Sequence, residues 1–224
     1  MAFVVTIDGP AGAGKSTVAK RLAKRLGIRY LDTGAIYRAL AYWMDKIGVS
    51  SEQLDEISQN LASIKIRLDK DKDDKDCVFV NGEDVTGSIR SPRIDRIVSG
   101  YAALRCVRDA LLGLQREQAE YGNLIADGRD TGSVVFPNAD LKFFLTASAE
   151  ARAERRYKEL LRKGEAVLYN EVLSRIKERD KTDSERANAP LAEPKGAIHI
   201  DTSHMEEAEV VSEFAFIIQS KLRE

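Results

Sequence analysis

The sequence predicts an α/β fold in which a five-stranded parallel sheet is flanked by helices. Two observations predict this fold. Five short apolar runs alternate with longer stretches whose apolar residues recur at helical spacing, a pattern typical of parallel sheets. A glycine-rich loop also joins the first run, residues 3–7, to the first helical stretch, as expected where a buried strand leads directly into a helix.

The glycine-rich loop is the most informative motif in the chain. It consists of Gly9, Pro10, Ala11, Gly12, Ala13, Gly14, Lys15, Ser16 and Thr17, and it matches the phosphate-binding pattern G-x-x-x-x-G-K-[ST]. Glycines let the backbone wrap closely around a phosphate, and the N–H groups at a helix N-terminus attract anions. In this motif Lys15 reaches the β- and γ-phosphates and Ser16 ligates Mg²⁺. The loop therefore predicts a site for a nucleoside triphosphate and Mg²⁺.

The other elements follow from apolar spacing and turn residues. The first helix carries Val18, Leu22 and Leu26 on one face and ends at Gly27. Strands are predicted at residues 28–32, 124–126, 141–145 and 197–200, and helices at residues 34–47, 50–61, 92–121 and 210–218. Ser148 is expected to cap a further, charged helix that holds Arg152, Arg155 and Arg156. A capping box of Ser50 and Gln53 is expected to begin the third helix. In residues 64–68 apolar residues alternate with charged ones, and residues 77–80 form a second apolar run that is followed by the turn signal Asn81-Gly82. The two runs predict an antiparallel hairpin whose charged tip, residues 69–76, is solvated.

Composition limits the class of protein. The chain has 224 residues, of which 43% are hydrophobic, enough for the core of one domain with insertions. The net charge of −1 argues against a protein that coats nucleic acid. No signal peptide and no run of about 18 apolar residues is found, so we expect a cytoplasmic protein without a membrane partner. Cys77 and Cys106 form no C-x-x-C motif and are expected to be core residues.

Charged residues gather where ligands bind in parallel sheets. Lys15, Asp32 and Asp127 all follow strand ends, and ligands bind outside the carboxyl ends of such strands. Asp127 comes directly after an apolar strand, the position of a carboxylate that helps to hold Mg²⁺. The sequence therefore predicts Ser16 and Asp127 as the metal ligands.

An arginine-rich segment is inserted between the fourth and fifth strands. Residues 151–186 carry 11 Lys and Arg against 8 Asp and Glu, a local charge of +3. This charge alone would also fit a solvated pair of helices with i,i+4 ion pairs. Phosphoryl transfer, however, needs cations around the γ-phosphate and the exclusion of water. A basic segment that closes over the crevice would meet both needs.

Several segments together resemble the bacterial-type cytidylate kinases of the P-loop nucleoside monophosphate kinase superfamily. These segments are Asp32-Thr33-Gly34-Ala35-Ile36-Tyr37-Arg38, Gly82-Glu83-Asp84-Val85-Thr86, Val107-Arg108, Asp127-Gly128-Arg129-Asp130 with Gly132 and Val134-Val135-Phe136, Arg152 with Arg155-Arg156, and Lys177-Glu178-Arg179-Asp180 with Asp183, Arg186 and Ala189-Pro190-Leu191. The resemblance runs nearly end to end. The run Asp127-Gly128-Arg129-Asp130 and the hairpin insertion are its most specific parts.

The resemblance implies a P-loop kinase fold with three parts. A core would comprise about residues 1–32, 92–148 and 188–224, a monophosphate-binding insertion about residues 33–91, and a short lid about residues 149–187. It also implies Mg²⁺-dependent transfer of the γ-phosphate of ATP to CMP or dCMP, in the pyrimidine metabolism of the cytoplasm. The implied partners are these two small molecules only, with no nucleic acid, and the chain is expected to be a monomer.

The resemblance further assigns site residues by matching position. The implied catalytic residues are Lys15, Arg129, Arg156 and Arg179, and ATP would be bound by residues 9–17 with Arg152 and Arg156. CMP would be bound by Thr33, Tyr37, Arg38, Ser99, Arg108, Arg129, Asp130, Arg179, Asp183 and Arg186. Within this set, Thr33, Arg38 and Arg129 would hold the acceptor phosphate, and Arg179, Asp183 and Arg186 would contact the sugar and the nearby phosphate.

Three residues, Ser99, Arg108 and Asp130, are assigned to the base, and the chemistry of cytosine agrees with this. Cytosine offers an N4 amino donor, which suits the carboxylate of Asp130, and acceptors at N3 and O2, which suit Arg108. Uracil reverses this pattern, because its O4 would face Asp130. Mismatched polar groups of this kind can give large selectivity.

Two alternatives remain at the level of the sequence. One is a P-loop kinase for another small acceptor, such as UMP, AMP or shikimate, although residues 127–130 differ from the Asp-Gly-Phe-Pro run expected of an adenylate-type kinase. The other is a GTP-driven switch, which should carry an Asn-Lys-x-Asp motif that this sequence lacks.

Overall fold

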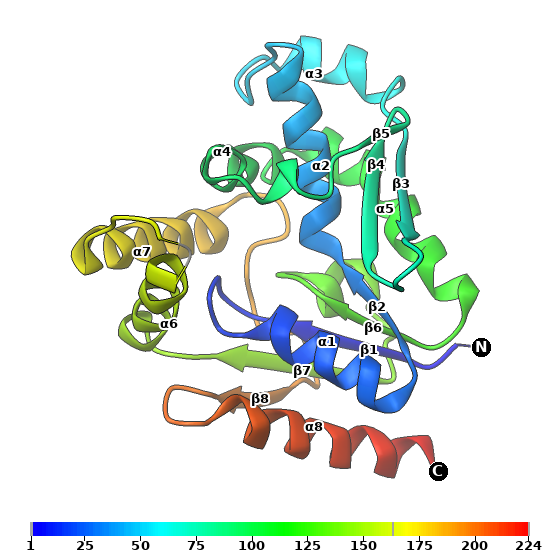
Figure 1. Cartoon of the computed structure of the whole chain (residues 1–224). Coiled ribbons are helices and arrows are strands. Elements are labelled where there is room, and N and C mark those ends of the chain that lie inside the picture. Colours follow the sequence, from blue (N-terminus) through cyan, green and yellow to red (C-terminus); the bar gives the residue numbers. More distant parts are fainter. Residues whose placement is uncertain (1, 163, 224) are drawn as a thin grey trace. The chain divides into compact units, whose positions relative to one another are not determined.

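A computed structural model describes residues 2–162 and 164–223 (Figure 1). It divides into two compact units. The first comprises residues 1–32 and 116–224 and contains the parallel sheet, and the second comprises residues 33–115. Among the described residues, no helix is both long and apolar enough to cross a membrane.

The first unit is built on a five-stranded parallel sheet with the order β2-β6-β1-β7-β8. The strands are β1 (Val4–Asp8), β2 (Arg29–Asp32), β6 (Leu124–Asp127), β7 (Leu141–Thr146) and β8 (Ile198–Asp201). In register, Ile7 of β1 and Asp32 of β2 both lie opposite Asp127 of β6. The five predicted strands are therefore confirmed. Strands β1, β2 and β6 end at Asp8, Asp32 and Asp127, so their carboxyl ends bring three acidic residues together.

Helices α1 (Lys15–Leu26) and α8 (Glu207–Leu222) pack together against the sheet (Figure 1). Val18, Leu22 and Phe214 are buried in one core cluster with residues of the strands. The rings of Phe143, from β7, and Phe214 stack with their centroids 4.0 Å apart. Helix α1 ends as predicted at Gly27, which has the left-handed conformation of a C-cap.

Two short elements and a helix pair complete the first unit. A 3-10 helix, η2 (Gln118–Tyr121), precedes β6, and a single π-helical turn, η3 (Thr131–Val135), follows it. Helices α6 (Ala149–Arg162) and α7 (Tyr169–Glu185) form the insertion between β7 and β8 and share a small core of Ala153, Leu160, Val172 and Ile176. Ser148 caps α6 as predicted, because its hydroxyl accepts the N–H of Ala151 at 3.1 Å.

The second unit combines helices with a three-stranded antiparallel sheet. It holds α2 (Thr33–Lys46), α3 (Leu54–Leu61), β3 (Ile66–Lys70), β4 (Asp76–Val80), β5 (Glu83–Asp84), η1 (Ser88–Arg90), α4 (Pro92–Ala102) and most of α5 (Arg105–Glu117). Strands β3 and β4 form the predicted hairpin, and the side chains at its tip are exposed. Residues Ala35 and Ala39 of α2 pack against Val78 and Val80 of β4 in the core of this unit.

Three expectations for the second unit are wrong in detail. The long helix predicted over residues 92–121 is interrupted after Ala102, where the chain turns before α5 begins at Arg105. At the predicted capping box only Gln53 takes part, because its side chain accepts the N–H of Ser50 while no side chain caps α3. Both cysteines are only partly buried. Cys77 alternates with the buried Val78 along β4 and therefore lies on the more exposed face.

The aromatic stack of Phe143 and Phe214 gives a test of this core. Both rings are fully buried. Replacing a buried Phe by Ala removes apolar contacts and leaves a cavity, so Phe214→Ala should lower the free energy of unfolding by about 3–5 kcal/mol. Phe216→Ala is the matched control, because Phe216 lies on the same helix with 73% of its surface exposed. Urea titration should find the control within about 0.5 kcal/mol of the original protein. Equal losses in the two variants would contradict this description of the core.

Candidate active site

The phosphate-binding loop joins β1 to α1, and its glycines permit its course. Gly9 has a φ of +145°, and a Cβ placed on it would come within 1.9 Å of the carbonyl oxygen of Leu145 in β7. Only glycine therefore fits between β1 and β7 at this point. Helix α1 begins at Lys15, so its N-terminal N–H groups adjoin the loop, as anion binding requires.

Lys15 is buried although it carries a charge. Its Nζ donates a hydrogen bond to the carbonyl oxygen of Pro10 at 2.8 Å, and only 5% of the residue is exposed. Burial lowers the pKa of Lys15 well below its ordinary value, and the guanidinium groups of Arg129 and Arg179 lower it further. The charges of Lys15, Arg129 and Arg179 therefore act on one another, and the carboxylates of Asp127 and Asp8 offset them in part. An anion bound beside the loop would relieve the repulsion among the three cationic side chains.

Asp127 ends β6 and binds two hydroxyl groups. Its carboxylate accepts hydrogen bonds from Ser16 Oγ at 2.6 Å and from the Tyr30 hydroxyl at 2.8 Å. Burial and the neighbouring carboxylate of Asp32 raise the pKa of Asp127 to about 6, although Ser16, Lys15 and Tyr30 favour its ionised form. The same burial, together with Asp127, raises the pKa of Tyr30, which keeps Tyr30 a hydrogen-bond donor.

The pair of Ser16 and Asp127 fits a Mg²⁺ ion. Both side chains offer oxygen, which Mg²⁺ prefers, and their oxygens lie within hydrogen-bond distance of each other beside the loop. Within residues 2–162 and 164–223, no group of three or more His, Cys, Asp or Glu side chains could hold a metal ion. Mg²⁺ is commonly held by one or two carboxylates together with substrate phosphates, so the two ligands suit an ion that arrives with a nucleotide.

The segment after β6 carries Arg129 and Asp130 toward helix α7. Arg129 Nε donates to Asp183 Oδ2 at 2.9 Å, and Arg179 Nε lies 4.0 Å from the same oxygen. Burial alone would raise the pKa of Asp183, but the arginines around it lower the pKa below its ordinary value. Asp130, in turn, accepts a hydrogen bond from Arg186 Nη2 at 3.2 Å. The structure therefore brings together five of the predicted site residues.

The two arginines assigned to ATP lie in different surroundings. Arg152 is buried, and its guanidinium donates to the carbonyl oxygens of Ala147 and Ala11 and to both oxygens of Asp180, at 2.6–3.0 Å. It thereby ties α6 to the phosphate-binding loop and to α7. Arg156 is more exposed and pairs with Glu159 one turn further along α6, at 2.7 Å. The assigned role of Arg156 stays a prediction.

The second unit holds the other five residues assigned to CMP. Thr33 and Tyr37 are buried one turn apart on α2, and the guanidinium of Arg108, from α5, lies 5.4 Å from the centre of the Tyr37 ring. Arg108 also donates to the carbonyl oxygen of Ala102 at 3.0 Å. Arg38 forms an ion pair with Asp95. Ser99 is partly buried on α4. Tyr37 and Arg108 are thus brought together within this unit, and the roles of all five residues stay predictions.

Sequence reasoning missed Tyr30 and Asp180, each of which holds a predicted site residue. Tyr30 lies in the second strand, where an aromatic residue is expected from its strand propensity alone. Asp180 falls in a helix with many alternating charges, where an exposed ion pair is the simplest expectation. No local signal distinguishes either residue, because their partners, Asp127 and Arg152, come from distant parts of the chain.

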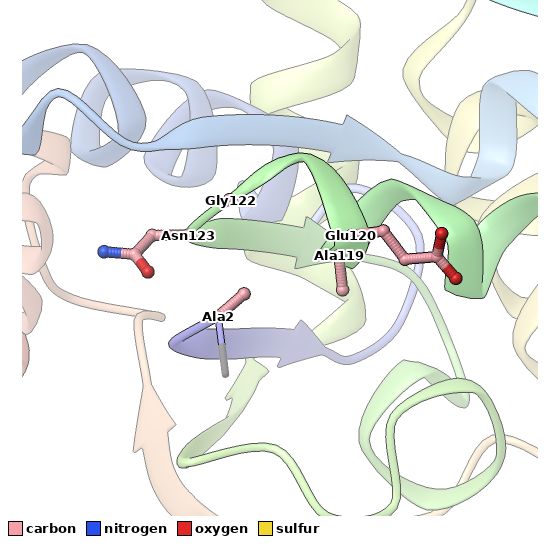
Figure 2. A pocket seen from close by; sticks show the side chains of 5 residues that line it. All are labelled: Ala2, Ala119, Glu120, Gly122 and Asn123. Carbon is pink, nitrogen blue, oxygen red and sulfur yellow. The ribbon is translucent and has the colours of Figure 1, made fainter.

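A pocket of about 660 Å³ lies away from these residues (Figure 2). Asn123, which lines it, directly precedes β6, and Ala2 lies two residues before β1; Ala119, Glu120 and Gly122 complete the lining. The pocket is therefore at the amino ends of the two strands, whereas Lys15 and Asp127 follow their carboxyl ends. Ligands of parallel α/β sheets bind at the carboxyl ends, so we do not include this pocket in the site.

The fold and the site together define a P-loop protein that binds a nucleoside triphosphate. Its phosphate-binding loop is carried by a parallel sheet of five strands. A solved structure of an uncharacterized protein from Eubacterium ventriosum ATCC 27560 shares this fold, with a TM-score of 0.52 over 98% of this chain and 99% of that chain at 16% identity.

Comparison of sequences identifies the family. The family model described as cytidylate kinase matches residues 5–220. A protein named cytidylate kinase from Caldanaerobacter subterraneus subsp. tengcongensis is 50% identical over 92% of this chain and 90% of its own length. Another of that name, from Thermodesulfovibrio yellowstonii, is 46% identical over 95% of this chain and 96% of its own length. The chain belongs to the cytidylate kinase family.

The ion pairs of Asp183 predict a stability that depends on pH. Because the folded pKa of Asp183 is lowered, its contribution is complete above the unfolded pKa of about 3.9 and is lost as the pH falls through the folded value. At pH 7, Asp183→Asn should lower the free energy of unfolding by about 1.5–3 kcal/mol, the worth of a charge-assisted hydrogen bond. The difference from the original protein should shrink below about pH 4.

Urea unfolding of both proteins across this pH range provides the measurement. Glu159→Gln is the control, since the pair of Glu159 and Arg156 is largely exposed and should contribute less than about 1 kcal/mol. The difference in the free energy of unfolding between Asp183→Asn and the original protein could instead stay the same at every pH. Asp183 would then not stabilise the protein through its charge.

Proposed function

We propose that this protein is a kinase that transfers the γ-phosphate of ATP to CMP or dCMP, giving CDP or dCDP. The observation that supports it most is that the guanidinium charges of Arg129 and Arg179 act on Lys15 of the phosphate-binding loop. Phosphoryl transfer needs little covalent help from the protein, but it needs fixed cations where negative charge develops. Membership of the cytidylate kinase family supports the identity of the acceptor.

The predicted site residues near the loop have separate parts in this proposal. Residues 9–17 hold the ATP phosphates, and Lys15 moves from the Pro10 carbonyl to the β- and γ-phosphates. Ser16 and Asp127 hold Mg²⁺, which when bound supplies positive charge to the phosphates. Arg129 and Arg179 exchange Asp183 for the acceptor phosphate and the transferring group. The lid, with Arg152 and Arg156, closes and excludes water.

The remaining residues select and hold the acceptor. Thr33, Tyr37 and Arg38 bind near its phosphate, and Asp183 and Arg186 contact the sugar. Asp130 accepts a hydrogen bond from cytosine N4, while Arg108 and Ser99 contact N3 or O2. An ionised carboxylate has about four acceptor positions, so Asp130 can bind N4 while it keeps Arg186. We further propose that the enzyme acts as a monomer in the cytoplasm, without nucleic acid or membrane.

Release of ADP with a panel of acceptors tests this function. CMP or dCMP should drive the reaction much faster than UMP or AMP, and Lys15→Ala should lower turnover at least about a hundredfold without unfolding the protein. A faster reaction with UMP or AMP would assign the enzyme to another acceptor. ADP release that does not depend on any acceptor would contradict a monophosphate kinase altogether.

A single substitution tests how the base is read. Asp130→Ala should raise the KM for CMP about 10- to 150-fold, the cost of one charge-assisted hydrogen bond, and leave the KM for ATP nearly unchanged. It should also narrow the difference between CMP and UMP, because the carboxylate no longer repels uracil O4. Asp73→Ala, at the exposed tip of the hairpin, serves as the control. An equal loss for CMP and UMP would mean that Asp130 does not distinguish the bases.

A further inference from the structure

Asp8 is a buried carboxylate that has no part in the proposed reaction. It is the last residue of β1, directly before the phosphate-binding loop, and its side chain is fully buried. Its Oδ1 accepts the N–H of Thr131 and its Oδ2 accepts the N–H of Gly132, both at 2.7 Å. A carboxylate with both oxygens bound to backbone N–H groups fixes the position of that backbone closely.

The neighbouring residue of β1 holds the other end of the same segment. The carbonyl oxygen of Ile7 accepts the N–H of Gly128 at 3.1 Å. Residues 128–132 are therefore attached to β1 at both ends, through Ile7 and Asp8. Between these attachments lie Arg129 and Asp130. Residue 9 begins the phosphate-binding loop. The carboxyl end of β1 therefore sets the positions of both that loop and residues 128–132.

The segment approaches β1 so closely that only glycine fits at residue 132. A Cβ on Gly132 would lie 2.6 Å from Thr6 Oγ1 and 3.1 Å from Asp8 Oδ2. Thr6 Oγ1 is buried and has no hydrogen-bond partner in the part of the chain that the structure describes. The Thr6 hydroxyl thus limits the space at residue 132, while Asp8 supplies the attachment.

Because Asp8 is buried, its carboxylate and the two backbone N–H groups each need the other as a hydrogen-bond partner. Burial raises the pKa of Asp8, whereas the N–H groups of Gly132 and Thr131 favour its ionised form. Loss of these donors would leave the carboxylate unsatisfied in the interior, and loss of the carboxylate would leave two N–H groups without their partner. Each side therefore depends on the other.

We propose that Asp8 is a positioning residue that holds Arg129 and Asp130 in register with the phosphate-binding loop. The proposal rests on the proposed function, because it gives these two residues to the acceptor. It follows that loss of the Asp8 carboxylate impairs use of CMP while ATP binding is largely kept. A purely structural role would instead lower stability without separating the two substrates.

Asp8→Asn is the test, because asparagine has nearly the same shape but places an NH₂ group against one of the two N–H donors. We expect kcat/KM for CMP to fall at least about tenfold, as for a lost charge-assisted hydrogen bond, and the KM for ATP to change less than about threefold. The amide hydrogens of Thr131 and Gly132 should exchange faster with solvent. Thr6→Ala, which removes the unpaired hydroxyl from the same strand without adding bulk, is the matched control and should keep the kinetic constants of the original protein.

Gly132→Ala provides a second route to the same result. Its new methyl group should displace the segment and reproduce the loss of CMP use, and Thr6→Ala in the same chain should restore part of it by making room. If Asp8→Asn does not fold, Gly132→Ala and the double variant Gly132→Ala/Thr6→Ala still show whether displacing residues 128–132 impairs the use of CMP. Normal kinetic constants in Asp8→Asn, or equal losses for CMP and ATP, would overturn the proposal.

The two hypotheses can fail separately. If the original protein does not phosphorylate CMP, the proposed function fails. Amide exchange at Thr131 and Gly132 needs no substrate, and unchanged exchange in Asp8→Asn would overturn the positioning role whatever the reaction is.

Discussion

The structure depends on the burial of charged groups at the carboxyl ends of β1 and β6. Asp8, Lys15 and Asp127 are each at most 5% exposed. Charges removed from water are costly unless hydrogen bonds replace their hydration. Each of the three has such partners: two N–H groups for Asp8, a carbonyl oxygen for Lys15 and two hydroxyl groups for Asp127. The course of the loops around them is therefore set by the need to satisfy these charges.

Two acidic side chains, Asp180 and Asp183, bind the arginines of the site. Asp183 binds Arg129 and lies near Arg179, and Asp180 binds Arg152 through two hydrogen bonds. Under the proposed function, the phosphates of the two substrates compete with these carboxylates for the same guanidinium groups. The carboxylates keep the arginines ordered and limit their mutual repulsion until substrates bind. Under this proposal, substrate binding exchanges one set of ion pairs for another, and the position of α7 depends on whether substrates are bound.

Much of the fold was predictable because its signals are local. The phosphate-binding loop, the five apolar strands and the hairpin of β3 and β4 each follow from a few adjacent residues. The order β2-β6-β1-β7-β8 was not predictable, because it depends on contacts between strands far apart in the chain. The break between α4 and α5 was also missed, since residues 103–104 contain neither Gly nor Pro to mark it.

The site shows the same division. Lys15, Ser16 and Asp127 could be found from motif and position, and the structure places Ser16 and Asp127 in contact. Asp8 and Tyr30 could not, because a residue at the end of a strand and an aromatic residue within one are ordinary. Their importance comes from partners more than 90 residues away. The ion pair of Asp183 with Arg129 likewise joins residues that only the fold brings together.

Under the proposed function, the buried charges around Lys15 form the site for the phosphates of ATP. A crystal structure with Mg²⁺, CMP and a non-hydrolysable ATP analogue tests it most directly. We expect Lys15 Nζ to leave the Pro10 carbonyl for the β- and γ-phosphates, Ser16 and Asp127 to hold Mg²⁺ directly or through water, and Arg129 to leave Asp183 for the acceptor phosphate. Phosphates bound elsewhere, with Lys15 still on Pro10 and Arg129 still on Asp183, would contradict it.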